Sequence, residues 1–187
     1  MKLTYKFLLA LFAILFLTMT SCKDDDPVID EPEEEVITDL VFTLTPLSGD
    51  PVTLSFSDPD GDGGDPPIVA TGTLAPNTTY TGTIEVKDES GTPTMNITSE
   101  IQEEDEDHQF FFALNGLNAT ITYDDMDANG NPIGLSSTLT TSDASNGTMT
   151  ITLRHEPDKT ASGVADGDAT NAGGETDIEV TFNVIIQ

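Results

Sequence analysis

The sequence predicts an all-β protein, and three observations support that prediction. Apolar and polar residues alternate along most of residues 36–187, which is the period of a strand with one buried face. Threonine fills many of the polar positions, as is typical of the solvated face of a sheet. Short runs rich in Gly, Asp, Asn and Pro separate the alternating stretches and are typical of turns.

The elements follow in order from this alternation. The first expected strand, 39–45, places Leu40, Phe42 and Leu44 on one face. Eight further stretches alternate in the same way: 52–56, 68–74, 80–86, 110–114, 120–123, 135–141, 148–153 and 177–186. About nine strands with such turns indicate an antiparallel immunoglobulin-like β-sandwich. The one helix candidate is 99–107, which is equally compatible with an acidic loop.

The first 21 residues are typical of a signal peptide. A short basic start precedes an apolar run at 7–17, which is shorter than the roughly 20 residues that span a bilayer. The run ends at Ser21-Cys22, and a small residue before Cys resembles the bacterial lipobox. We therefore expect a lipoprotein signal peptide at 1–21 and lipid attachment at Cys22. The alternative is an ordinary secretory signal with an incidental Cys.

An acidic tether follows at 22–35, and a single domain is expected at 36–187. Eight acidic residues in the tether repel one another and cannot bury apolar surface, which predicts disorder. The Lys23-Asp24-Asp25-Asp26 run resembles the export signal of Bacteroidota surface lipoproteins. It implies display on the extracellular side of the outer membrane, beside a possible outer-membrane receptor. The alternative is a generic acidic linker.

The overall charge excludes several classes of protein. The chain has 34 Asp and Glu against 6 Lys and Arg, a formal net charge of -28. This field repels phosphates, so nucleic acid is not an expected partner, and a basic patch for anionic lipid is excluded. One Cys excludes an intrachain disulfide and a Cys-rich zinc site. No motif indicates catalysis, so we expect a non-enzymatic protein.

Two Asp-rich turns match part of a calcium loop. Asp58, Asp60 and Asp62, with Asp65 nearby, place carboxylates at alternate positions before a Gly. Asp125, Asp127 and Asn129 repeat the pattern before Gly130. Neither loop has the Glu at its twelfth position that completes such a site. Calcium is therefore one interpretation, and ordinary turn chemistry is the other.

The two histidines suggest a transition-metal site. His108 and His155 each lie at the end of an expected strand, and Glu156 follows His155. If those strands pair, the three side chains converge on an ion such as Zn²⁺ or Cu²⁺, with Asp107 as a further donor. The alternative is a pair of surface histidines at strand ends.

A family resemblance adds to this interpretation. Segments such as LAPNTTYTGTI, EDEDHQFFF, DANGNPIGL and NAGGETDIEVTFNVIIQ resemble a flavobacterial (Bacteroidota) group of small surface lipoproteins. That group carries the name "type 1 periplasmic binding fold superfamily protein", which implies a two-lobed α/β fold, whereas the residues here predict an all-β one. The resemblance implies a surface lipoprotein and assigns no functional residues.

Two functions are therefore open. The first is an outer-membrane lipoprotein that acts as a binding or accessory module for a metal ion or nutrient. The second is a structural cell-envelope or surface-coat protein without a small-molecule ligand.

Overall fold

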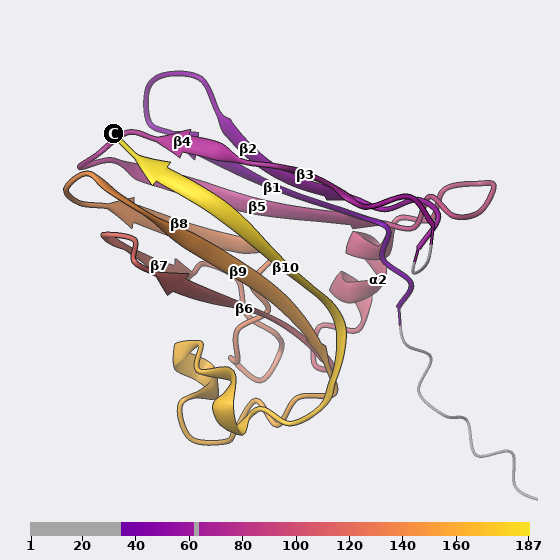
Figure 1. The fold of residues 1–187 in the computed structure, drawn as a ribbon. Coiled ribbons are helices and arrows are strands. Elements are labelled where there is room, and N and C mark those ends of the chain that lie inside the picture. The colour runs from indigo at the N-terminus through magenta and orange to yellow at the C-terminus, as the bar shows by residue number, and fades with distance from the viewer. Residues whose placement is uncertain (1–34, 62–63) are drawn as a thin grey trace, which may run out of the picture. The chain divides into compact units, whose positions relative to one another are not determined.

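Two β-sheets face each other in the computed structural model, which describes residues 35–61 and 64–187 (Figure 1). The first sheet has the strand order β3-β2-β1-β5-β8-β7, and the second has the order β4-β10-β9-β6. The strands of the described residues are β1 (Asp39–Pro46), β2 (Val52–Ser57), β3 (Ile68–Ala70), β4 (Gly72–Leu74), β5 (Thr79–Lys87), β6 (His108–Asn115), β7 (Ala119–Tyr123), β8 (Ser136–Thr141), β9 (Ser145–His155) and β10 (Glu175–Ile186). The expected all-β sandwich is confirmed.

The core is the layer of alternate side chains between the sheets. β1 buries Leu40, Phe42 and Leu44 completely, as its alternation predicts. From the other sheet, β10 contributes Ile178, Val180, Phe182, Val184 and Ile186. Outward positions of the first sheet carry mainly Thr and Ser, which explains the threonine content of the sequence.

One expected strand proves to be two. The stretch 68–74 divides at Thr71: β3 pairs with β2 in the first sheet, and β4 pairs in parallel with β10 in the second. The chain therefore crosses between the sheets here, and a Cβ at Gly72 would lie 2.5 Å from Val52 Cγ1. Glycine permits this close approach. The crossing gives ten strands instead of nine, and one parallel pair in an otherwise antiparallel fold.

A short helix closes one end of the core. α2 (Ile97–Glu103) buries Ile97 and Ile101 and lies at the end of the sandwich where β1 begins (Figure 1). Thr98 Oγ1 joins it to β5 by accepting from Val86 N at 2.8 Å and donating to Val86 O at 3.1 Å. The helix predicted at 99–107 is thus present but starts and ends earlier. Two 3-10 turns, η1 (Val164–Asp166) and η2 (Ala169–Asn171), lie in the loop before β10.

The predictions for 1–21 and for Cys22 fall outside the described residues, as does most of the predicted tether. Residues 34–187 form one unit, so Glu35 belongs with the sandwich. No helix among the described residues is long and apolar enough to cross a membrane.

The Tyr123 side chain covers the side of the core beside β6. Its hydroxyl donates a hydrogen bond to the carbonyl oxygen of Phe110 at 2.8 Å, and burial raises the pKa of Tyr123 to about 12. An acid with a raised pKa in the folded state stabilises the fold below its unfolded pKa of about 10. That stability is lost as the pH rises from about 10 to about 12.

We predict that Tyr123→Phe lowers the free energy of unfolding at neutral pH by about 1 kcal/mol, because the hydrogen bond to Phe110 is lost. The variant should also lose less stability than the wild type between pH values of about 10 and 12. Urea unfolding at a series of pH values measures both effects. If the free energies of unfolding of the two proteins fell equally over this pH range, the raised pKa would not belong to Tyr123.

Candidate metal centre

Four potential metal ligands meet at one end of the sandwich. Glu35, His108, His155 and Asp177 each offer one donor atom, and these atoms all lie within 4.8 Å of one another. The four residues are far apart in the sequence. Their convergence therefore depends on strand pairing and on where the chain enters β1.

The pairing of β6 with β9 places the two histidines side by side. His108 is directly opposite His155 in this antiparallel ladder, and their rings stack with centroids 4.7 Å apart and planes 22° apart. Both rings occupy the inner face, since His108 is two residues before the buried Phe110 and His155 two residues after the buried Leu153. The pair thus continues the core layer with polar side chains.

A β-bulge brings in Asp177. In the ladder between β10 and β9, Thr176 is opposite Arg154 and Ile178 is opposite Leu153, so Asp177 is the extra residue. Regular alternation from the buried Ile178 would turn Asp177 outward. A bulge lets two consecutive residues face the same side, and here it aims the carboxylate at the histidines.

Glu35 approaches from the segment before β1, in the other sheet. Its Oε1 lies 2.9 Å from His108 Nε2, and its Oε2 lies 3.6 Å from His155 Nδ1. The side chains of His108, Glu35 and His155 are only 0%, 8% and 12% exposed. The centre is therefore almost closed to solvent and is supplied by both sheets.

The end of α2 orients His108. The ring atom Nδ1 lies 3.1 Å from the carbonyl oxygen of Glu104, the residue that caps the helix. A hydrogen donated from Nδ1 to this oxygen leaves the Nε2 lone pair directed at the other three side chains. Metal-ligating histidines are usually held in this way by a backbone carbonyl.

The donor set suits a divalent transition metal. Two imidazoles and two carboxylates are ligands of Zn²⁺ and Cu²⁺, and two carboxylates balance the charge of the ion. A metal about 2.0–2.2 Å from each donor holds tetrahedral ligands about 3.4 Å apart, close to the spacing of Glu35 from both histidines. Among the described residues, neither His108 Nε2 nor Glu35 Oε2 makes a hydrogen bond. Such buried polar atoms need a partner, and a metal ion supplies one.

The sequence identified two of these four residues. Glu156 and Asp107, the other donors expected beside the histidines, are not part of the cluster. Glu156 is exposed with a φ of 49°, and its backbone N–H donates to Asp107 O at 2.7 Å as the chain leaves β9. Asp177 gave no signal in the sequence, because regular alternation places it on the opposite face from the buried Ile178. Glu35 gave no signal, since it ends a run of acidic residues.

The first Asp-rich turn is a largely exposed loop that follows β2. Asp60 Oδ2 accepts from the backbone N–H of Asp65 at 2.8 Å, a contact typical of a turn. Asp58 is half-buried, and its backbone N–H donates to Thr38 O, just before β1, at 2.7 Å. Asp62 lies outside the described residues, and calcium binding at this loop stays a prediction.

The second Asp-rich turn already uses its carboxylates. Asp125 accepts from the backbone N–H groups of Gly134 and Ser136, at 2.8 and 2.9 Å. Asp127 Oδ1 accepts from those of Asn129 and Asn131, both at 2.9 Å. Asp127 Oδ2 lies 3.1 Å from Lys159 Nζ. An ammonium group therefore stands where calcium was expected, and calcium binding here also stays a prediction.

Lys159 and Asp127 form a buried ion pair that fixes this turn. Burial opposes ionisation of Asp127, but the N–H of Asn131 and the Lys159 ammonium outweigh it and hold the pKa of the carboxyl below its usual range. The Lys159 side chain is 4% exposed, and Nζ also donates to Asp105 O at 2.5 Å. The pair thus joins the 127–131 turn to the segment after α2.

We predict that Lys159→Met lowers the free energy of unfolding by about 3 kcal/mol, because it leaves a buried carboxylate without its cation. The matched control Lys87→Met, at a partly exposed position, should change it by less than about 0.5 kcal/mol. Urea unfolding at neutral pH compares the two. Equal losses of unfolding free energy in the two variants would show that the buried Lys159–Asp127 pair adds no stability beyond that of an ordinary surface lysine.

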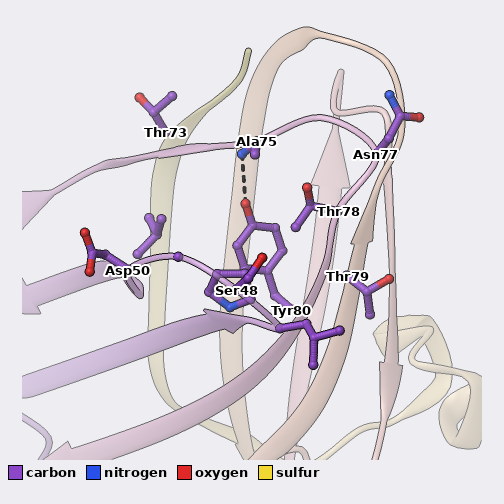
Figure 2. A pocket seen from close by; sticks show the side chains of 12 residues that line it. Ser48, Asp50, Thr73, Ala75, Asn77, Thr78, Thr79 and Tyr80 are labelled. Carbon is purple, nitrogen blue, oxygen red and sulfur yellow. Dashed lines mark hydrogen bonds between the residues drawn. The ribbon is translucent and has the colours of Figure 1, made fainter.

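A hollow lies at the end of β1 away from the four-residue cluster, beside the turn from β1 into β2 (Figure 2). Half of its twelve lining residues have hydroxyl or amide side chains, Asp50 is its one acid, and the others are apolar residues or glycine. The Tyr80 hydroxyl accepts from the backbone N–H of Ala75 at 2.8 Å and so holds the loop before β5. The lining residues include no histidine or cysteine, so this hollow offers fewer potential metal ligands than the four-residue cluster.

The fold and the cluster together define a class: an acidic β-sandwich protein with a two-histidine, two-carboxylate centre. The chain belongs to the Bys1 family, described as Blastomyces yeast-phase-specific protein, whose profile matches residues 66–182. The match includes His108 and His155 as well as Asp177, whereas Glu35 precedes it. Neither a curated protein nor a solved structure matches the chain.

This membership corrects the resemblance to a flavobacterial lipoprotein group, which is wrong. The segments behind that resemblance are alternating strands and turns rich in Gly, Asp and Asn. Such segments are shared by many unrelated sandwiches, because they meet the common demands of strand and turn geometry. The family description names no activity.

Proposed function

We propose that this protein is a non-enzymatic binding module whose ligand is one divalent transition-metal ion, held by Glu35, His108, His155 and Asp177. The observation that carries the proposal is the His108 Nε2 atom. It is fully buried, oriented from behind by Glu104 O, and directed at three further donors without making a hydrogen bond among the described residues.

The closed geometry favours binding over catalysis. Catalytic zinc sites keep an open position for water or substrate, whereas structural and storage sites fill all four positions from the protein. Here four protein donors converge. The side chains of Glu35, His108 and His155 are at most 12% exposed. The two imidazole nitrogens also favour zinc or copper over calcium, which prefers oxygen ligands.

We also propose that the module is exported and anchored in the outer membrane by lipid on Cys22. The apolar run at 7–17 and its Ser21-Cys22 end support this proposal. More than one acyl chain on a single Cys gives stable anchoring. A metal-binding module in this location can serve an outer-membrane receptor, which is the partner that we propose.

We predict that metal-free protein binds one Zn²⁺ per chain, and that saturating zinc raises its unfolding temperature by several degrees. His155→Gln should weaken binding by more than the roughly 10–100-fold that loss of an outer-shell group costs. Calorimetric titration measures affinity and stoichiometry, with Cu²⁺ and Ca²⁺ as parallel titrants.

Glu156→Gln is the matched control for this experiment, because Glu156 follows His155 in the sequence but lies outside the cluster. Its zinc affinity should equal that of the wild type. An unfolding temperature that stays within about one degree in excess zinc would refute the metal centre and favour a structural envelope protein.

For the anchor, we predict that Cys22→Ala moves the protein from the membrane fraction to the soluble fraction, because its lipid attachment is lost. Ser21→Ala keeps a small residue before Cys22 and should remain in the membrane. Fractionation of cells producing each variant gives the answer. A Cys22→Ala protein that stays membrane-bound would overturn lipidation.

A further inference from the structure

The four potential ligands come from both sheets of the sandwich. His108, His155 and Asp177 come from neighbouring strands of the second sheet, while Glu35 belongs to residues 35–37, the segment that leads into β1 of the first sheet. We call residues 35–37 the lead-in segment. A metal bound by all four donors therefore connects this segment directly to the opposite sheet.

The attachment of the chain to its own sheet begins only at Thr38. Thr38 N donates to Lys87 O at 3.0 Å, Thr38 O accepts from Asp58 N at 2.7 Å, and Thr38 Oγ1 accepts from Glu89 N at 2.8 Å. Among the described residues, the lead-in segment makes no backbone hydrogen bond. Val36 is 59% exposed, and Ile37 is only partly buried against the core. The position of the segment thus depends largely on the Glu35 side chain.

The contact of Glu35 with His108 suits a shared cation. Oε1 and Nε2 are 2.9 Å apart, yet Nε2 forms no hydrogen bond within the described part of the chain. Because Nδ1 of the same ring donates to Glu104 O, Nε2 of the neutral imidazole carries the lone pair. With no cation between them, this lone pair and the carboxylate oxygen face each other and repel.

We infer that metal occupancy controls whether the lead-in segment is fastened to the sandwich. This inference rests on the proposed metal-binding function and adds a conformational consequence to it. With metal, Glu35 is a ligand and residues 35–37 are held against β6 and β9. Without metal, Glu35 leaves the histidines, and the segment detaches up to Thr38.

Backbone NMR order parameters of the full chain, with and without saturating Zn²⁺, test the inference. Zinc should raise the order parameters of Val36 and Ile37 from below about 0.6 to about 0.85, because Glu35 then fixes the segment. The order parameter in the middle of β1, as at Phe42, should stay near about 0.85 in both states. Calorimetry on the same samples confirms that zinc is bound.

Two variants separate fastening from binding. Glu35→Gln retains three ligands, so it should still bind zinc, more weakly, but show no rise in the order parameters of Val36 and Ile37 even at saturation. Asp177→Asn also removes one ligand, but one that is not on the lead-in segment. At saturating zinc its Val36 and Ile37 should show the same rise as in the wild type.

The outcomes distinguish this inference from the proposed function. If the wild type binds zinc and the order parameters of Val36 and Ile37 are unchanged, the metal centre stands and the fastening is refuted. The fastening is also refuted if zinc raises these two order parameters in Glu35→Gln as much as in the wild type. If no variant and no wild-type sample binds zinc, the proposed function itself fails, and the fastening with it.

Discussion

The sandwich depends on one constraint: every second residue of its facing strands must point into a layer between two sheets. In β1 and β10 the residues that point into this layer are apolar. In β6 and β9 the inward series ends in a histidine, His108 at the start of β6 and His155 at the end of β9. The histidines occupy the next inward positions after Phe110 and Leu153. The proposed metal centre is therefore an extension of the core in which polar side chains continue the same alternation.

This constraint also explains what the sequence could and could not predict. Alternation was enough to find the strands and to place both histidines at strand ends. It also argues against Glu156, because consecutive residues of a strand face opposite sides, and the chain turns away after His155. Asp177 shares the histidines' side only because a bulge interrupts the alternation. A bulge depends on the partner strand, so sequence periodicity alone does not reveal it.

Glu35 lies beyond what local patterns can predict for a different reason. It ends a run of acidic residues whose composition is typical of a tether, and its position depends on contacts with strands that come much later in the chain. The Asp-rich turns show the opposite case. Their carboxylates match a calcium pattern, yet Asp127 accepts from the backbone N–H of Asn131 in its own turn, and Asp125 accepts from that of Gly134 further along the chain. Turn formation and cation binding require the same residue types, and only the contacts distinguish them.

The position of β10 has a consequence for the order of assembly. Of the ten described strands, this one is synthesised after the other nine, yet it lies inside its sheet, between β4 and β9, and lines the core with five apolar residues. A ribosome delivers the chain from its N-terminus, so the core is incomplete until β10 has emerged. During that interval β4 and β9 have unpaired edges that invite aggregation. The strongly acidic character of the chain keeps growing copies apart through mutual repulsion, which protects the protein before it has a structure.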